Sequence, residues 1–326
     1  MASSPSRSGR PAAAGALPYA VVDLGTNTFH LLVGRFGPDA AGALTVAHRE
    51  RHYVRVAAEG IDVIGPAAYA RALAAATSIG EALARHEVAG AAAFGTAAFR
   101  TAANGPQLRA EVAARLGVPV QVIDGRTEAA LITAGVQAAG LPPVGRQLVV
   151  DIGGGSTEFI LVEDGVPGFR DSYPLGAQVL RRRFHREEPF GKTQHDALVA
   201  HLDVALAELL RHARAPLTLV GASGTFDVLG DLYGVRLGPA LREVDPARIR
   251  ALYRESAAMT AERRLADPRI PPERADMIVV ALALVDFVLE RLPDTRVLTC
   301  AYALKEGALW CGLELPGGEG GDRGQR

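Results

Sequence analysis

The chain contains two copies of one pattern, VVDLGTNTFHLLV at residues 21–33 and VVDIGGGSTEFIL at residues 149–161. In each copy an apolar run ends in an aspartate, Asp23 or Asp151, and a turn of glycine and hydroxyl residues leads into a second apolar run. This arrangement predicts a strand–turn–strand hairpin. The two aspartates are 128 positions apart, about the length of one domain. We therefore predict two domains that open with the same hairpin.

Length and composition agree with two soluble domains. The chain has 326 residues, of which 48% are hydrophobic and 22% are charged. These fractions are typical of globular proteins and exclude disorder of the whole chain. The formal net charge is −1, so binding of nucleic acid through overall positive charge is not expected. An anionic substrate would need a local positive site.

The sequence carries few signs of disulfides, export or a membrane. Its two cysteines, Cys300 and Cys311, lack CxxC spacing, which argues against a disulfide scaffold or a structural zinc site. Residues 1–18 contain no continuous apolar core of a secretory signal. The apolar stretch 277–289 is short, which favours a buried helix over a membrane span. We expect a cytoplasmic protein without membrane partners, with disordered tails at 1–17 and 316–326.

Between the tails, strands and helices alternate. Apolar runs predict strands at 19–23, 29–36, 88–94 and 118–123, and helical spacing predicts helices at 66–87, 106–116 and 128–139. Strands that alternate with helices indicate an α/β fold rather than an all-α or all-β one.

The two repeated turns have a composition that suits phosphate binding. Glycines let the backbone approach a ligand closely, and the exposed N–H groups of such a turn bind anions. An aspartate at the strand end adds an oxygen ligand, and Mg²⁺ binds one or two carboxylates together with phosphate and water. The alternative is an ordinary glycine hairpin with a solvated aspartate. For one loop alone, the ordinary hairpin explains the sequence about as well as phosphate binding does. For the two loops together, it explains the sequence much less well. A third turn, GASGT at 221–225, is a weaker candidate.

In this order, the motifs resemble the exopolyphosphatase/guanosine pentaphosphate phosphohydrolase (Ppx/GppA) family, from about residue 19 to residue 310. The resemblance rests on the two repeated loops and on four further segments: FGTAAFRTAAN at 94–104, VIDGRTEAALITAGV at 122–136, RADMIVVALAL at 274–284 and YALKEGALW at 302–310. Departures from the family pattern are Thr127, Ser223, Ala303 and Lys305. The chain also resembles the short two-domain form of the family.

The resemblance implies a fold of two ribonuclease H-like α/β domains, as in the actin-like ATPase superfamily, with a cleft between them. Residues 18–134 and 303–315 would form the first domain, and residues 135–302 the second. The chain would cross between the domains near 128–140, and a last helix at about 304–314 would return to the first domain.

The resemblance also implies a function and roles for individual residues. The expected activity is an exopolyphosphatase that releases orthophosphate from inorganic polyphosphate, with Mg²⁺, or Mn²⁺ in its place. Glu128 would be the general base and Arg100 would clamp the terminal phosphate. Asp151, Glu158 and Asp23 would bind the metal. The phosphate-binding residues would be Asp23, Gly25, Thr26, Asn27, Thr28, Gly153, Gly154, Gly155, Ser156, Thr157, Gly224 and Thr225.

Other functions stay open at this point. The alternatives are a guanosine pentaphosphate 5′-phosphohydrolase, an ATP-dependent kinase of the wider fold, and a sensor that binds polyphosphate or an alarmone without turnover. Relatives are often dimers, so a homodimer is open too, although no stretch indicates an obligate interface.

Several candidate residues also have ordinary structural interpretations. Taken alone, Glu128 could be a carboxylate at a helix start, Arg100 a surface arginine, and Glu158 a cross-strand polar partner. His30 is kept out of the catalytic set because a histidine at the core edge explains it equally well. The basic run Arg181–Arg183 is more often a solvated helix face than a guide for a polyanion. Arg55 is a weak candidate near the cleft.

Overall fold

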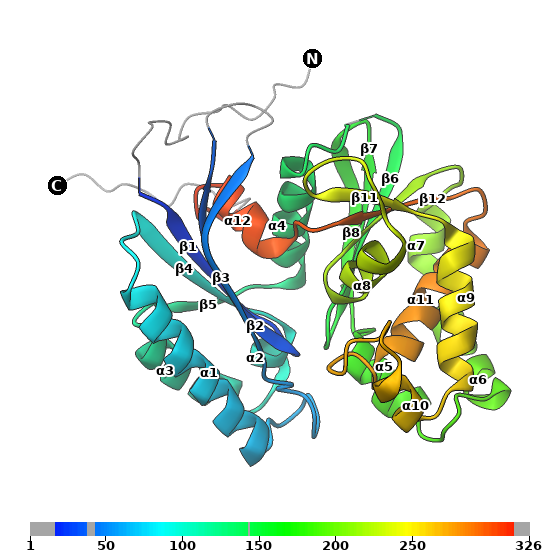
Figure 1. Cartoon of the computed structure of the whole chain (residues 1–326), viewed down its shortest axis with the longest axis horizontal. Helices are drawn as coiled ribbons and strands as arrows, with labels where there is room; N and C mark the ends of the chain where they lie inside the picture. The colour runs from blue at the N-terminus through cyan, green and yellow to red at the C-terminus, as the bar shows by residue number, and fades with distance from the viewer. Residues whose placement is uncertain (1–16, 38–42, 143, 316–326) are drawn as a thin grey trace.

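A computed structural model of the chain describes residues 17–37, 43–142 and 144–315. The predicted tails at 1–17 and 316–326 lie outside the described residues, except for Leu17. The described part forms two α/β halves side by side (Figure 1), each built on one sheet.

The first sheet has the strand order β3-β2-β1-β4-β5. β1 pairs antiparallel with β2 and parallel with β4. The strands span β3 Leu44–Tyr53, β2 Thr28–Phe36, β1 Tyr19–Leu24, β4 Gly90–Gly95 and β5 Val120–Val122. Figure 1 shows α1 (Pro66–Ala84) and α3 (Gly105–Leu116) below this sheet, with the short α2 (Ala97–Thr101) after β4.

The second sheet repeats that order and extends it. Its order is β10-β11-β12-β9-β6-β7-β8. β6, β7, β8, β9 and β12 take the places of β1 to β5, because β6 pairs antiparallel with β7 and parallel with β9. The strands span β6 Arg146–Ile152, β7 Thr157–Glu163, β8 Val166–Tyr173, β9 Thr218–Ala222, β10 Val235–Arg236, β11 Leu241–Val244 and β12 Arg296–Cys300. The repeat and the prediction of two ribonuclease H-like sheets are confirmed.

The remaining helices belong mostly to the second half. They are α5 Ala177–Phe184, α6 Lys192–Ala205, α7 Ala207–His212, α8 Gly224–Tyr233, α9 Pro246–Ala258, α10 Ala261–Ala266 and α11 Ile278–Arg291. The apolar stretch 277–289 is the buried helix that its sequence predicts, since nearly every residue of α11 is buried. In the part of the chain that the structure describes, no helix has the length and apolar character needed to span a membrane.

Two helices, α4 (Gly125–Ala138) and α12 (Leu304–Trp310), join the halves. α4 follows the first sheet in sequence but contacts β6, β7 and β8 of the second, whereas α12 follows the second sheet and contacts β1 and β2 of the first. The helices also pack on each other with backbones close together. A Cβ on Gly135 would lie 2.1 Å from the Ala303 carbonyl oxygen, and one on Gly307 would lie 1.8 Å from that of Leu131. Glycine is therefore required at this crossing.

Some predicted boundaries need correction. The helix predicted from Glu128 begins earlier, at Gly125, because the Asp124 carboxylate accepts a hydrogen bond from the Thr127 N–H and caps the helix there. The last helix ends at Trp310 and not near residue 314. The sequence reasoning missed β3 and β8, the mostly exposed strands that pair with the second strand of each hairpin. The domain limits 18–134 plus 303–315 and 135–302 stay a prediction.

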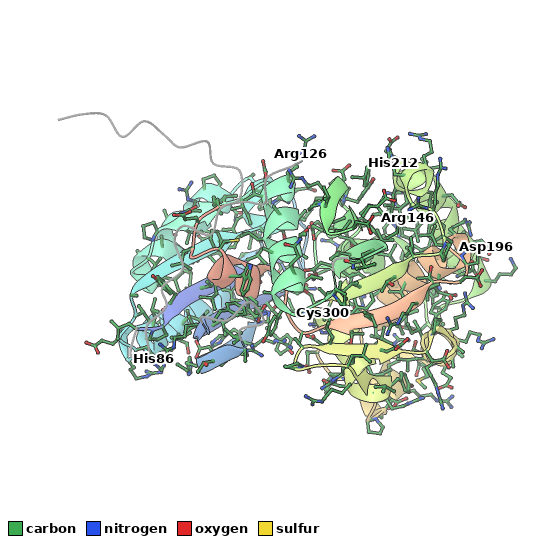
Figure 2. The ribbon with its side chains drawn as sticks, turned by 90° about the horizontal axis from the view of Figure 1, so that it is seen from above. His86, Arg126, Arg146, Asp196, His212 and Cys300 are labelled. Carbon is green, nitrogen blue, oxygen red and sulfur yellow. The ribbon has the colours of Figure 1, made fainter. Side chains whose placement is uncertain are left out.

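Figure 2 shows the same two halves from above, with Cys300 at their junction, His86 on the far side of the first half and Asp196 on the far side of the second. Cys300 is the last residue of β12, where the chain leaves the second sheet for α12. The junction is therefore made by the crossover segment itself, and the site described next lies along it.

Candidate active site

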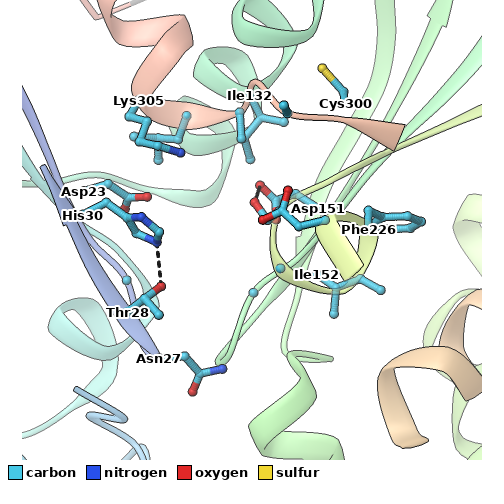
Figure 3. Close-up of a pocket in the computed structure, with 18 of the residues that line it drawn as sticks. Asp23, Asn27, Thr28, His30, Ile132, Asp151, Ile152, Phe226, Cys300 and Lys305 are labelled. Carbon is cyan, nitrogen blue, oxygen red and sulfur yellow. Dashed lines mark hydrogen bonds between the residues drawn. The ribbon is translucent and has the colours of Figure 1, made fainter. Parts of the chain in front are cut away.

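A pocket of about 620 Å³ lies between the two halves. Figure 3 shows Asp23 and His30 on one side, Asp151 on the other and Lys305 near Asp23. The predicted site residues on its wall are Asp23, Gly25, Thr26, Asn27, Thr28, Glu128, Asp151, Gly153, Gly154, Gly155, Ser156, Glu158 and Gly224. Residues separated by up to 201 positions thus share one cavity.

Three predicted site residues are placed elsewhere. Arg100, Thr157 and Thr225 are absent from the pocket wall. Thr157 is fully buried, and its hydroxyl donates a hydrogen bond to the Leu175 carbonyl oxygen at 2.9 Å. Thr225 is buried near the start of α8. The Thr157 hydroxyl is therefore engaged in the fold and is not directed at a ligand.

The two repeated loops have the same backbone geometry. The Gly25 N–H donates to the Thr28 carbonyl oxygen at 3.0 Å, and the Gly153 N–H donates to that of Ser156 at 3.0 Å. A Cβ on either glycine would lie within 3.0 Å of the same accepting oxygen. The tight turn between the strands thus depends on glycine in both loops.

The loops also contact each other across the junction. A Cβ on Gly154 would lie 2.5 Å from the Asn27 side chain, and a Cβ on Gly155 would lie 2.8 Å from the Thr26 hydroxyl oxygen. The loops interlock in this way only because the second loop has no side chains at these two positions.

The residues at equivalent places in the loops differ in charge. Asp151 pairs with Glu158 in the β6–β7 ladder, and in the same register Asp23 pairs with His30 in the β1–β2 ladder. The His30 ring nitrogen Nε2 lies 2.8 Å from the Thr28 hydroxyl. Burial and the nearby cations, first among them Lys305, hold the pKa of His30 well below its usual value. The second loop therefore presents two carboxyl groups, whereas the first presents one carboxyl group and a neutral imidazole.

Glu128 reaches the pocket from the first turn of α4. It is buried, with 7% of its surface exposed. Arg100, at the exposed end of α2, places its Nη1 3.3 Å from Glu128 Oε2 and donates from the same nitrogen to the Ile123 carbonyl oxygen at 2.6 Å. Arg100 thus contacts the predicted base and not the pocket.

The carboxyl groups of the site are poorly solvated. Burial raises the pKa of Asp151 to about 6, although the Ser223 hydroxyl opposes this rise. Burial, followed by the charge of Asp151, raises the pKa of Glu158 to about 7. Asp23 keeps part of its surface exposed, yet loss of water raises its pKa to about 7 in spite of the Lys305 ammonium. Burial and the neighbouring Glu158 raise the pKa of Glu128 well above its usual value.

These carboxyl groups fit a divalent cation, because a cation would relieve both their desolvation and their mutual repulsion. Asp151 and Glu158 are neighbours in the ladder, and Asp23 faces the same pocket. Within the described ranges, no three Asp, Glu, His or Cys side chains converge closely enough to hold a metal ion alone. Mg²⁺ accepts such a site, since it needs only one or two carboxylates beside water and phosphate oxygens.

The sequence reasoning missed the cations of the pocket wall. They are Arg49 and Arg51 of β3, Arg242 of β11, Arg274, and Lys305 of α12. Arg274 and Lys305 belong to segments 274–284 and 302–310, which carry the family resemblance. Their place in these segments could have marked them as candidates. Arg49 and Arg51 lie on an edge strand with no apolar alternation, so no pattern marks them.

Three side-chain pairs connect the first half to the second, two from β3 and one from Arg55 just after it. Arg51 Nη2 lies 3.4 Å from Asp227 Oδ2, the Tyr53 hydroxyl donates to Glu273 at 2.8 Å, and Arg55 forms an ion pair with Asp276. Arg55 is therefore a contact between the halves and is not on the pocket wall. The Arg181–Arg183 run lies exposed on α5, also away from the wall.

The chain is similar to known phosphatases over most of its length. A family model described as "Ppx/GppA phosphatase family" matches residues 38–314. A Haemophilus influenzae protein named "Putative exopolyphosphatase" is 27% identical over 299 residues, which cover 89% of this chain and 90% of that protein.

Solved structures agree with this match. The crystal structure of an exopolyphosphatase from Cytophaga hutchinsonii superposes with a TM-score of 0.84 at 31% identity, covering 91% of this chain and 97% of that one. The Ppx/GppA family member from Aquifex aeolicus shares the fold, with a TM-score of 0.74 at 20% identity over 91% of this chain and 97% of that chain. Because the family model matches most of the chain and a solved relative shares its fold, the protein belongs to the Ppx/GppA phosphatase family.

Proposed function

We propose that this chain hydrolyses the terminal phosphoanhydride bond of inorganic polyphosphate and releases orthophosphate by direct attack of water. One observation carries the proposal: two equivalent glycine loops and the buried carboxyl group of Glu128 face a single pocket. The similar proteins that are named exopolyphosphatases support it.

The loops would hold the phosphate chain. Backbone N–H groups of Thr26, Asn27, Gly154 and Gly155, with the hydroxyls of Ser156 and Thr28, can donate to phosphate oxygens. The wall cations Lys305 and Arg274 would balance the negative charge of the substrate. Phosphoryl transfer depends mainly on such positioning and charge neutralisation.

Glu128 would accept the proton of the attacking water. A base works best when its pKa lies near the working pH, and burial moves the Glu128 pKa upward in that direction. Arg100 contacts Glu128 and would hold its carboxylate in place. The proposal therefore gives Arg100 a role through Glu128 in place of the phosphate clamp that the motif suggests.

Asp151 and Glu158, with Asp23 opposite, would hold Mg²⁺ or Mn²⁺. When bound, the ion would neutralise charge on the phosphate oxygens. The carboxyl groups themselves would then stay ionised at neutral pH, because a bound cation lowers the pKa values that burial has raised.

The test is orthophosphate release from short polyphosphate with Mg²⁺, compared between wild type and Glu128→Gln. Loss of a general base should lower kcat by about 10²–10⁴-fold. Glu163→Gln is a matched control, because Glu163 is an exposed carboxylate paired with Arg146 at the end of β7. Activity that survives in Glu128→Gln would assign the base to another group.

Guanosine pentaphosphate should be assayed beside polyphosphate, since loops that bind phosphates serve either substrate. Release of phosphate from guanosine pentaphosphate alone would replace the proposed substrate. Binding of either compound without release by the wild type would instead indicate a sensor.

A further inference from the structure

Ser223 has a backbone conformation that serine rarely adopts. It precedes α8 with φ +65° and ψ 174°. Glycine occupies this region without strain, whereas a side chain there is unfavourable. A strained residue persists only where the surrounding structure enforces it, and such residues gather at functional sites. Ser223 lies on the wall of the pocket.

The Ser223 side chain does not cap the helix that it precedes. Ser223 occupies the N-cap position of α8, where a serine oxygen normally accepts a hydrogen bond from the first turn of the helix. No such side-chain bond is formed here. Instead, the Ser223 hydroxyl donates to Asp151 Oδ2 at 2.8 Å. Backbone strain and a missing cap thus accompany one hydrogen bond to a pocket carboxylate.

That hydrogen bond fixes how Asp151 faces the pocket. Asp151 is buried, with 7% of its surface exposed, and its side chain is directed into the cavity (Figure 3). A hydroxyl on Oδ2 restricts rotation of the carboxylate and leaves Oδ1 for another partner. Glu158 is held in the same manner, because the Ser172 hydroxyl donates to its Oε1 at 2.6 Å. The Ser156 side chain also hydrogen-bonds to Glu158, so each carboxylate of the second loop is held by at least one serine hydroxyl.

We propose that Ser223 is a positioning residue that orients Asp151 toward a divalent cation. The inference rests on the proposed function for the identity of the cation, but its geometry is independent of the substrate. Groups that hydrogen-bond to metal ligands affect metal affinity strongly, typically by 10–100-fold when they are removed.

Two substitutions separate the hydroxyl from the backbone. Ser223→Ala removes the hydroxyl and keeps a side chain at positive φ, whereas Ser223→Gly removes the hydroxyl and relieves the strain. Ser256→Ala is the control, because Ser256 is fully buried and its hydroxyl donates to the Tyr253 carbonyl oxygen away from the pocket. Mn²⁺ binding to each full-length protein is measured by electron paramagnetic resonance without any substrate.

Both Ser223 variants should bind Mn²⁺ about 10–100-fold more weakly than wild type, and by the same factor. Ser256→Ala should bind it like wild type. Unchanged Mn²⁺ affinity in both Ser223 variants, or weaker binding in Ser223→Ala alone, would overturn the proposal. Absence of Mn²⁺ binding by the wild type would overturn it as well.

Thermal unfolding without metal provides a second readout. Ser223→Gly should unfold about 2–4 °C or more above Ser223→Ala, because only glycine relieves the strained backbone. Equal unfolding midpoints of the two variants would show that the backbone at residue 223 is not strained, and would overturn the proposal. Phosphate release by the wild type is recorded in parallel. A wild type that binds Mn²⁺ but releases no phosphate would contradict the proposed function and leave the Ser223 comparison intact.

Discussion

Arg100 lies against Glu128, with its Nη1 3.3 Å from Glu128 Oε2, although the two residues are on different helices, α2 and α4. The guanidinium is the cation that opposes the rise of the Glu128 pKa. A residue outside the pocket wall thus partly offsets the effect of burial and of Glu158 on the pKa of the proposed base.

Arg100→Ala should move the acid limb of the pH–rate profile to higher pH. Removal of a neighbouring cation raises the pKa of a carboxylate, so a larger fraction of Glu128 is protonated and inactive at a given pH. The measurement is kcat/KM for polyphosphate between pH 5 and pH 9. A uniform fall in rate at every pH, without displacement of the limb, would contradict this coupling. Arg109→Ala is a suitable control, because Arg109 donates to the Val120 carbonyl oxygen at a distance from the site.

Asp23→Asn should make the stability of the metal-free protein less sensitive to a rise in pH from about 4 to 7. The folded state raises the pKa of Asp23 from 3.8 to about 7, so it holds the proton better than the unfolded chain does. Stability from this group is therefore present at low pH and is lost as pH rises from about 4 to 7. The loss is up to roughly 4 kcal/mol for such a shift. Asparagine has no proton to lose.

The check is thermal unfolding of wild type and Asp23→Asn with EDTA at pH 5 and pH 8. The variant should gain stability relative to wild type at pH 8. Asp196→Asn, an exposed position on α6, should follow the wild type. If wild type and Asp23→Asn lost stability in parallel, the raised pKa of Asp23 would be refuted. Addition of Mg²⁺ should restore wild-type stability at pH 8, because it binds only the folded site.

Gly154→Ala should push the two loops apart. The new Cβ would lie 2.5 Å from the Asn27 side chain, and overpacking of this kind destabilises a protein by about 1–3 kcal/mol. We expect phosphate release to fall at least tenfold, because loop spacing sets the positions of the bound phosphates. Gly168→Ala is the control, since its Cβ would meet only the Leu161 carbonyl oxygen, at an ordinary contact distance of 3.9 Å.

A second substitution tests the cause of that effect. Asn27→Ala removes the side chain that the new methyl group meets. Combined with Gly154→Ala, it should cost less stability than the sum of the single changes, as contacting residues do in a double-mutant cycle. Strict additivity of the unfolding free energies would show that the two loops are not in contact.

Arg51→Ala should raise KM for polyphosphate more than Arg182→Ala does. Arg51 lies on the pocket wall, whereas Arg182 is exposed on α5. We expect an increase of about 3–10-fold at low salt that shrinks at high salt, because screening weakens attraction to a polyanion. The measurement is KM at two ionic strengths. Equal effects of both substitutions would instead support a guiding role for the Arg181–Arg183 run.

The repeated hairpins and the glycine loops could be predicted from the sequence because both are local. An aspartate at a strand end and a glycine turn between apolar runs define one hairpin each, and the 128-residue offset defines the repeat. The pocket cations could not be predicted this way. Arg49, Arg274 and Lys305 are far apart in the chain and meet only through sheet order and the path of α12. The bond from Ser223 to Asp151 likewise depends on a parallel pairing of β6 with β9.

The exchange of α4 and α12 between the sheets has a consequence for dissection of the chain. A fragment that stops after α4 would lack the helix that contacts β1 and β2, and a fragment that starts at β6 would lack the helix that contacts β6 to β8. Each fragment would expose apolar sheet surface to water, including Val21 and Leu32 in one and Val149 and Ile160 in the other. Neither half should therefore fold stably when expressed alone. Deletions or fusions should preserve both α4 and α12.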